Sequence, residues 1–141
     1  MVNNNIIKNI IMPGVVKKKY ELTSSKLQTH EFTQEINNLV VVFKVLFLNN
    51  SLYIYISEQN HQTLSDLSLV LPNSDGLSTR ILGSGNENIS TSLGTKVAHL
   101  VKKPVYLSVN INHNLYLIEK QIEQRLFDEI KNNRDRFIAS Q

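Results

Sequence analysis

The sequence contains no cysteine, and this absence excludes several classes of protein. Disulfide-stabilised scaffolds, thiolate metal sites and thiol catalysis all need cysteine side chains. At 141 residues the chain is long enough to bury a hydrophobic core without such cross-links. Its 41% of hydrophobic and 19% of charged residues are typical of an ordinary globular domain.

Long hydrophobic runs are missing too. The longest uninterrupted apolar run, residues 39–43, is far shorter than a membrane-spanning helix requires. Near the amino terminus, Lys8 and Asn9 interrupt the continuous apolar stretch that a secretory signal peptide needs. We therefore expect no membrane partner and a cytoplasmic location, with the nucleus left open as a second compartment.

Positive charge is not concentrated in one part of the chain. The net charge is +3, and the short basic patches alternate with acidic residues. These patches are Lys17-Lys18-Lys19, Lys102-Lys103, and Arg134 with Arg136. A nucleic-acid-binding protein usually gathers its positive charge in one stripe beside stacking aromatic rings. The distribution indicates a solvated surface and no nucleic-acid partner.

The clearest structural signal is a β-hairpin. Two β-rich runs, LVVVFKVLFL and SLYIYIS, flank Asn49-Asn50, and asparagine tolerates the left-handed backbone that tight turns need. A two-residue loop places Leu48 opposite Ser51 and Val45 opposite Ile54. One face of the hairpin is then entirely apolar, with Val41, Phe43, Val45, Phe47, Leu52, Ile54 and Ile56.

The second face of the hairpin is a candidate functional surface. It carries Val40, Val42, Lys44, Leu46, Leu48, Tyr53 and Tyr55. A sheet with one wet face should present mostly polar residues there, and this hairpin does not. Such a face is covered either by another part of the same chain or by a partner protein, and the sequence leaves both open. The candidate interface residues are Val42, Leu46, Tyr53 and Tyr55.

Further strands are expected around this hairpin. The patterns predict strands within residues 63–71, 78–82 and 105–111, and another within residues 15–22. Strands therefore follow one another through the first two thirds of the chain, whereas the strongest helical patterns come late. This order predicts an α+β fold, with an antiparallel sheet of about six strands and two main α-helices packed on one face.

Two segments carry strong helical periodicity. Residues 90–102 place apolar side chains on one face, and Ser90, Thr91 or Ser92 offers a hydroxyl cap. The second helix begins after Asn114, a candidate cap, and extends into the 130s. A third, shorter helix is considered at residues 29–36.

The stretch GSGNENISTSLGTK, residues 83–96, raises the question of a nucleotide site. Gly83 and Gly85 match the start of the dinucleotide-binding pattern G-x-G-x-x-G, but Asn88 stands where the third glycine belongs. The phosphate-loop pattern fails as well, because no Gly-Lys pair precedes a serine or threonine. The stretch favours a strand-to-helix turn, and we expect no cofactor.

Catalytic and metal-binding patterns are equally weak. The histidines, His30, His61, His99 and His113, are far apart in the sequence and form no H-E-x-x-H motif. The serines lack the G-x-S-x-G elbow. We therefore expect no catalytic residue, no metal site and no enzymatic activity.

Three segments together are similar to the proteasome assembly chaperone 4 family. They are SLYIYIS (residues 51–57), LSTRILGSGNENISTSLGTKVAHLVKKPVYLSVNI (residues 77–111) and LYLIEKQIEQRLFDEI (residues 115–130). Shared features include the S-T-x-x-L-G strand at residues 78–83, the Ser90-Thr91-Ser92 helix start and the strand VYLSVNI. The resemblance covers roughly residues 26–130. It implies one such domain at residues 26–141, after an amino-terminal extension, residues 1–25, that is partly strand or disordered.

The resemblance implies a small chaperone without enzymatic activity. Family members pair with a proteasome assembly chaperone 3-like protein, and the heterodimer engages an α-type subunit to promote assembly of the 20S proteasome α-ring. Whether the isolated chain forms a homodimer is left open.

Two functions from other classes compete with this expectation. One is a protein- or membrane-surface-binding α+β module in trafficking or cytoskeletal regulation, for which Lys17 to Lys19 would supply lipid contacts. The other is a nucleotide-using enzyme that acts through Gly83 and Gly85.

Overall fold

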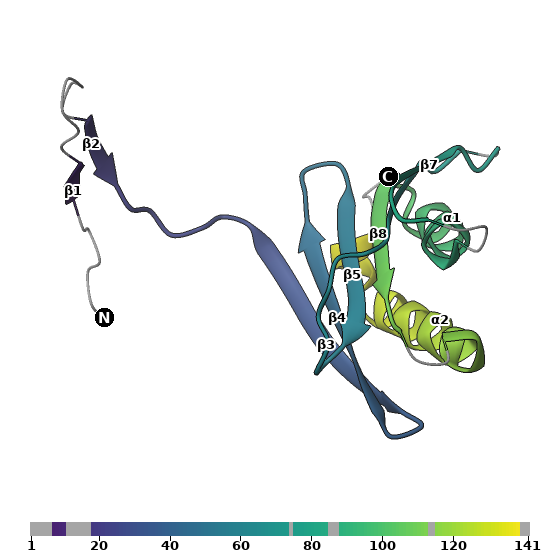
Figure 1. The fold of residues 1–141 in the computed structure, drawn as a ribbon. Helices are drawn as coiled ribbons and strands as arrows, with labels where there is room; N and C mark the ends of the chain where they lie inside the picture. Colours follow the sequence, from purple (N-terminus) through teal and green to yellow (C-terminus); the bar gives the residue numbers. More distant parts are fainter. Residues whose placement is uncertain (1–6, 11–17, 74, 85–87, 113–114, 139–141) are drawn as a thin grey trace.

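The main body of the protein is a six-stranded sheet, as the computed structural model of residues 7–10, 18–73, 75–84, 88–112 and 115–138 shows (Figure 1). The strand order is β3-β4-β5-β8-β6-β7, and a separate pair, β1-β2, precedes it. The elements along the chain are β1 (Ile7–Ile10), β2 (Lys18–Glu21), β3 (Gln28–Ile36), β4 (Leu39–Phe47), β5 (Leu52–Glu58), β6 (Leu67–Val70), β7 (Ser78–Leu82), α1 (Ile89–Val101), β8 (Val105–Asn110), α2 (Leu115–Asn132) and α3 (Arg134–Phe137).

The predicted hairpin is β4-β5, and its register is confirmed. Val45 faces Ile54 and Phe47 faces Leu52. Leu48 N–H donates to the carbonyl of Ser51 at 3.0 Å, so Asn49 and Asn50 form the two-residue turn. Period-two alternation along these strands therefore separates the two faces as expected.

The α+β class and the six-stranded main sheet are confirmed, but one strand pair differs from an all-antiparallel arrangement. β5 and β8 are parallel, whereas the other pairs in this sheet are antiparallel. The reason is the connection through α1, which carries the chain from β7 to β8. Because β6 is antiparallel to both, β7 and β8 run in the same direction with β6 between them.

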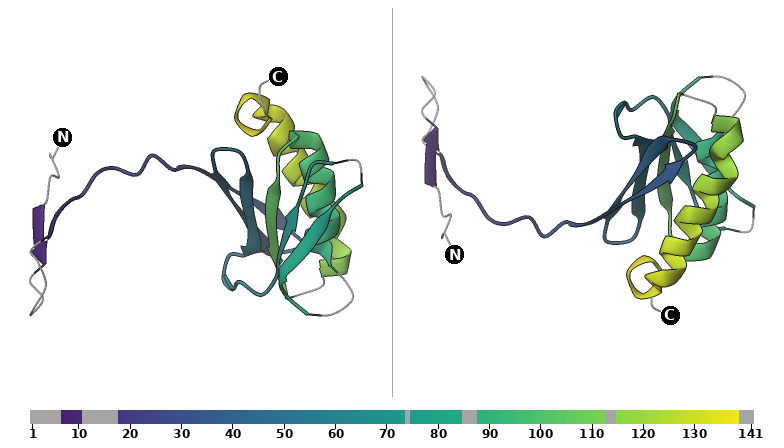
Figure 2. Two further views of the ribbon diagram at one scale, coloured as in Figure 1. Left: turned by 90° about the horizontal axis from the view of Figure 1, so that it is seen from above. Right: turned by 90° about the horizontal axis from the view of Figure 1, so that it is seen from below.

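Both main helices cover the same face of the sheet (Figure 2). The strand registers align one row across this face, made of His30, Val45, Ile54 and Leu107. At one end of the row, His30 contacts Glu129 of α2 at 2.6 Å. At the other end, Gly94 of α1 packs closely on Leu107. A methyl group added at Gly94 would lie 3.6 Å from the Cβ of Leu107. The helices therefore bury their apolar faces against one side of the sheet.

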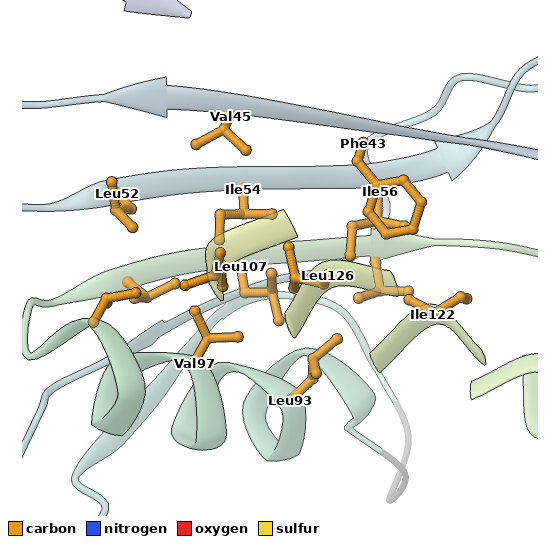
Figure 3. Close-up of a cluster of buried hydrophobic side chains, with 14 of the residues drawn as sticks. Phe43, Val45, Leu52, Ile54, Ile56, Leu93, Val97, Leu107, Ile122 and Leu126 are labelled. Carbon is orange, nitrogen blue, oxygen red and sulfur yellow. The ribbon is translucent and has the colours of Figure 1, made fainter. Parts of the chain in front are cut away.

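The hydrophobic core lies between this face and the helices (Figure 3). Helix α2 contributes its predicted stripe, and Ile118, Ile122, Leu126 and Ile130 are all buried. The largest fully buried side chains on the strands include Phe43, Ile54, Ile56 and Leu107.

The helix considered at residues 29–36 is wrong: these residues belong to β3. All nine residues of β3 pair with β4, from Gln28 opposite Phe47 to Ile36 opposite Leu39. The backbone groups of the largely buried β4 need hydrogen-bond partners, and this demand decides the local structure. Asn37 and Asn38, with φ of 50° and 65°, close a second two-residue turn.

Helix α1 starts close to its expected position but has a different cap. The cap is Asn88, whose side chain accepts a hydrogen bond from the Thr91 amide at 3.0 Å. Ser90 is instead fully buried and bonds elsewhere. Asn114, the expected cap of α2, lies outside the described residues. None of the described helices is both long and apolar enough to span a bilayer.

The amino-terminal extension contains the expected strand within residues 15–22, because β2 pairs with β1 in an antiparallel ladder. Residues 22–27, which lead from this pair to the main sheet, are exposed. The domain boundary between residues 25 and 26 stays a prediction.

Candidate functional site

The open face of the sheet, defined as the face opposite the helices, is built from rows that cross the strands. The first row consists of Thr29, Leu46, Tyr53, Tyr106 and Leu69. The second consists of Glu31, Lys44, Tyr55 and Ser108, and the third of Thr33, Val42, Ser57 and Asn110. The four predicted interface residues all lie on this face, spread over the three rows.

Residues 59–66 fold over the second and third rows. The hydroxyl of Tyr55 donates to the Thr63 carbonyl at 2.6 Å, and Lys44 Nζ donates to Gln62 Oε1 at 2.9 Å. Asn110 Oδ1 accepts from the Ser65 amide at 2.7 Å. The chain therefore covers this half of the open face with its own backbone, which is one of the two alternatives that the sequence left open.

The first row is not covered in this way. Leu46, Tyr53, Tyr106 and Leu69 are all only partly buried, and Leu48, two residues beyond Leu46, is 39% exposed. Aromatic and aliphatic side chains arranged side by side with partial exposure are typical of the centre of a protein–protein interface. The uncovered first row is therefore the best candidate for a partner site.

The four candidate residues differ in accessibility. Val42 is only 3% exposed in the single chain, and Tyr55 is tied to residues 59–66 through its hydroxyl. Leu46 and Tyr53 remain accessible in the first row. Partner contact by any of the four remains a prediction, but the geometry favours Leu46 and Tyr53 as the direct contacts.

Sequence reasoning missed Tyr106 and Leu69 as members of the same row. The alternation in VYLSVNI already indicated that Tyr106 lies on the side opposite Val105 and Leu107. What it could not indicate is that β8 pairs with β5 and β6, which brings Tyr106 beside Tyr53 and Leu69. The sequence contains no local signal for pairing between strands that are far apart along the chain.

The Tyr53 phenol lies in a partly dehydrated environment. Burial raises the pKa of Tyr53, and the neighbouring Tyr55 raises it further. The phenol is therefore neutral at physiological pH and keeps its hydroxyl proton. Its hydroxyl has no hydrogen-bond partner among the described residues, so it is available as a donor to a partner.

A buried polar network fixes residues 59–66 and the start of α1 to the sheet. The Ser90 hydroxyl donates to Asp66 Oδ2 and accepts from the Val109 amide, the latter at 3.0 Å. Asn110 Oδ1 also accepts from the Asp66 amide at 3.1 Å. These side chains bond one another, which accounts for most of their polarity, but Asp66 Oδ1 is buried without a hydrogen-bond partner among the described residues.

The described part of the glycine stretch has a structural role. Gly83 has a φ of +121°, and a Cβ there would lie 2.7 Å from the Asp66 carboxylate. Only glycine fits this close approach at this backbone angle. A carboxylate next to the turn is unfavourable for phosphate, and the Asn88 side chain already caps the Thr91 amide. Gly85 lies outside the described residues.

The histidines stay apart in the structure as well. His30 contacts Glu129, whereas His61 and His99 are exposed, and His113 lies outside the described residues. The part of the chain that the structure describes holds no cluster of metal-ligating side chains.

Three comparisons bear on what this chain is similar to. The family model "Proteasome assembly chaperone 4" matches residues 40–111. Human proteasome assembly chaperone 4 is 26% identical over 105 residues, which cover 72% of this chain and 84% of the human protein.

A solved structure, titled as a novel chaperone complex for yeast 20S proteasome assembly, contains a chain of similar fold. Its TM-score is 0.58 at 12% identity, and the match covers 75% of this chain and 96% of the yeast complex's chain. At this identity the likeness concerns the fold alone.

Proposed function

The chain belongs to the proteasome assembly chaperone 4 family, and we propose that it acts as one half of a heterodimeric chaperone for the 20S proteasome. The family is one of chaperones and not of enzymes. The proposed partner is a proteasome assembly chaperone 3-like protein. The proposed client is an α-type proteasome subunit, which the heterodimer holds during assembly of the α-ring in the cytoplasm.

The uncovered first row of the open face is the main structural support for a heterodimer. Four members of the first row of the open face, Leu46, Tyr53, Tyr106 and Leu69, form a partly exposed and largely apolar strip, whereas residues 59–66 cover Lys44, Tyr55 and Asn110 in the second and third rows. A second sheet packed on this row would remove its apolar surface from water, which is the main driving force of association.

The mechanism needs no catalytic group. A chaperone of this kind favours one arrangement of α-subunits because it binds that arrangement more tightly than the alternatives. It is released when subunits that join later compete for the surface it occupies. The hydrogen bonds around Asp66 and Ser90 hold residues 65–66 and the start of α1 to the sheet, which is a structural role.

The test is co-expression of the tagged full chain with the chaperone 3-like protein of the same organism, followed by affinity purification and size-exclusion chromatography. A one-to-one complex that captures α-type subunits from lysate, but few mature β-type subunits, is the expected result. A chain that stays alone, and that recovers neither protein, would show that family membership does not extend to this function.

A further inference from the structure

The outer edge of β3 is an open sheet edge of unusual length. β3 has nine residues in continuous register with β4, whereas β7 at the other edge has five and an irregular register at Leu67/Ser68. Proteins commonly protect edge strands by shortness, bulges, proline or charged side chains, above all lysine. β3 is long and contains no proline or lysine, and its acidic side chains are Glu31 and Glu35. No strand in the described part of the chain pairs with its outer side.

The backbone groups that face outward can be assigned from the hairpin. A two-residue turn makes Ile36 and Leu39 a hydrogen-bonded pair, so the even-numbered residues of β3 bond to β4. The amides and carbonyls of residues 29, 31, 33 and 35 therefore point away from the sheet.

Two side-chain contacts agree with this assignment. Arg136 Nη2 donates to the Thr29 carbonyl at 3.4 Å, and Gln34 Nε2 donates to the Glu35 carbonyl at 3.0 Å. Both ends of the edge are thus partly occupied. In the middle, Glu31 and Thr33 are exposed and present two amides and two carbonyls to an incoming strand.

A groove runs beside this edge, between β3 and α2. Its volume is about 350 Å³, and it is lined by Gln34 and Ile36 of β3 and by Lys120, Gln124, Arg125 and Asp128 of α2. A groove between an edge strand and a helix is the setting in which an extended peptide adds to a sheet, because alternate side chains enter the groove. The polar lining suits polar side chains on that side of the added strand.

On the open-face side of β3, exposed negative charge determines which kind of peptide segment fits the edge. The side chains of Glu31 and Glu35 lie on the open face, and both residues are exposed. Residues directly opposite one another on neighbouring strands lie within about 5 Å, where opposite charges stabilise pairing. We propose that the centre of β3 is a docking edge for an extended segment of a partner protein that carries lysine or arginine at alternate positions.

A second copy of this chain fits the edge poorly. Antiparallel pairing of two β3 edges about Phe32 would place Glu31 opposite Thr33 and Glu35 opposite Thr29. Glu31 and Glu35 of both copies would then share one face as close diagonal neighbours, where like charges repel. The chain's own amino-terminal strands pair with each other, and Figure 1 shows the β1-β2 pair apart from β3, at the far end of the connecting residues 22–27.

This proposal goes beyond the proposed function, because it concerns an edge and not the open face. The probe is a short fluorescein-labelled peptide in which lysine alternates with threonine and valine, titrated into the full chain by fluorescence anisotropy. An acidic peptide with glutamate in place of lysine is the control. Saturable binding of the basic peptide, at least about tenfold tighter than the acidic one, is expected.

Two variants test the geometry. Thr33→Pro removes an outward amide that β4 does not use, and proline is tolerated at such edge positions, whereas Thr33→Val keeps the amide. The proline variant should weaken binding about tenfold, and the valine variant should leave it unchanged. The double variant Glu31→Lys with Glu35→Lys alters only exposed side chains and should reverse the preference between the peptides. It remains informative if Thr33→Pro does not fold.

Amide hydrogen exchange measures whether the edge of β3 is free in the chain alone and protected when the basic peptide binds. The Glu31 and Thr33 amides should exchange rapidly in the chain alone and slowly when the basic peptide is present. Protection in the chain alone would mean that the edge is already occupied, by the amino-terminal segment or by a second copy, and would overturn the proposal. Absence of saturable binding, or equal binding by the proline and valine variants, would overturn it as well.

Discussion

His30 Nε2 lies 2.6 Å from Glu129 Oε1, and this contact joins the edge strand β3 to α2 across 99 positions of sequence. Arg136 Nη1 lies 3.2 Å from His30 Nδ1. Because a guanidinium can only donate, Nδ1 accepts and Nε2 carries the proton that faces the carboxylate. Arg125 donates to the other oxygen of Glu129 at 2.7 Å. One carboxylate thus fastens the helix to the edge of the sheet.

The first prediction concerns the pH dependence of this contact. Burial raises the pKa of Glu129, but hydrogen bonds from His30 and Arg125 outweigh it, so the pKa lies below its ordinary value of 4.5. A carboxyl whose pKa is lower in the folded state contributes stability that is fully present above the unfolded-state pKa. That contribution is lost as the pH falls through the folded-state pKa.

Glu129→Gln should therefore lower the free energy of unfolding by on the order of 1–3 kcal/mol at neutral pH, and by less as the pH falls below 4.5. Urea denaturation at several pH values measures this difference. Glu123→Gln is the control, because Glu123 pairs with a Lys96 side chain that is 53% exposed, and such pairs contribute little. A pH-independent loss for Glu129→Gln would contradict the assignment.

The second prediction concerns the cover over the open face. Tyr55→Phe removes the 2.6 Å hydrogen bond to the Thr63 carbonyl and should lower the free energy of unfolding by about 1 kcal/mol. Amides in residues 59–66 should also exchange faster with solvent. Tyr53→Phe is the matched control, because the Tyr53 hydroxyl has no partner among the described residues. Equal stability and equal exchange in the two variants would argue against this anchor.

The third prediction tests the role of Gly83. Gly83→Ala places a methyl group 2.7 Å from the Asp66 carboxylate at a φ of +121°, so it should lower the free energy of unfolding by on the order of 2–3 kcal/mol. Gly76→Ala has a φ of +59° and a nearest contact of 3.5 Å, and should cost about 1 kcal/mol. Thermal or urea unfolding measures both. If Gly83→Ala were instead neutral for stability, the close approach to Asp66 would not be what requires glycine.

The fourth prediction tests the first row as a partner site. Tyr53→Ala should weaken association with the chaperone 3-like partner by on the order of 1–3 kcal/mol if Tyr53 anchors the interface. Isothermal titration calorimetry with the purified partner measures this loss. Tyr116→Ala on α2 serves as the control, because that side chain is 88% exposed on a helix that covers the other face of the sheet. Normal binding by a correctly folded Tyr53→Ala chain would remove Tyr53 from the site.

Elements with local signals could be predicted from the amino-acid pattern alone. The register of β4-β5 follows from period-two alternation on both sides of Asn49-Asn50. The buried stripe of α2 follows from apolar residues at helical spacing, such as Ile118 and Ile122. The family resemblance, carried by residues 51–57, 77–111 and 115–130, is confirmed by the family match at residues 40–111.

Features that depend on residues far apart along the chain could not be predicted in this way, because long-range packing sets them. Residues 29–36 became strand because β4 needed hydrogen-bond partners, although their own pattern also allowed a helix. β8 lies parallel to β5 because α1 returns the chain across the core face, and this pairing brings Tyr106 beside Tyr53. Residues 59–66 cover Tyr55 but not Tyr53. Alternation fixes which face a side chain occupies, whereas long-range packing decides whether that face meets solvent.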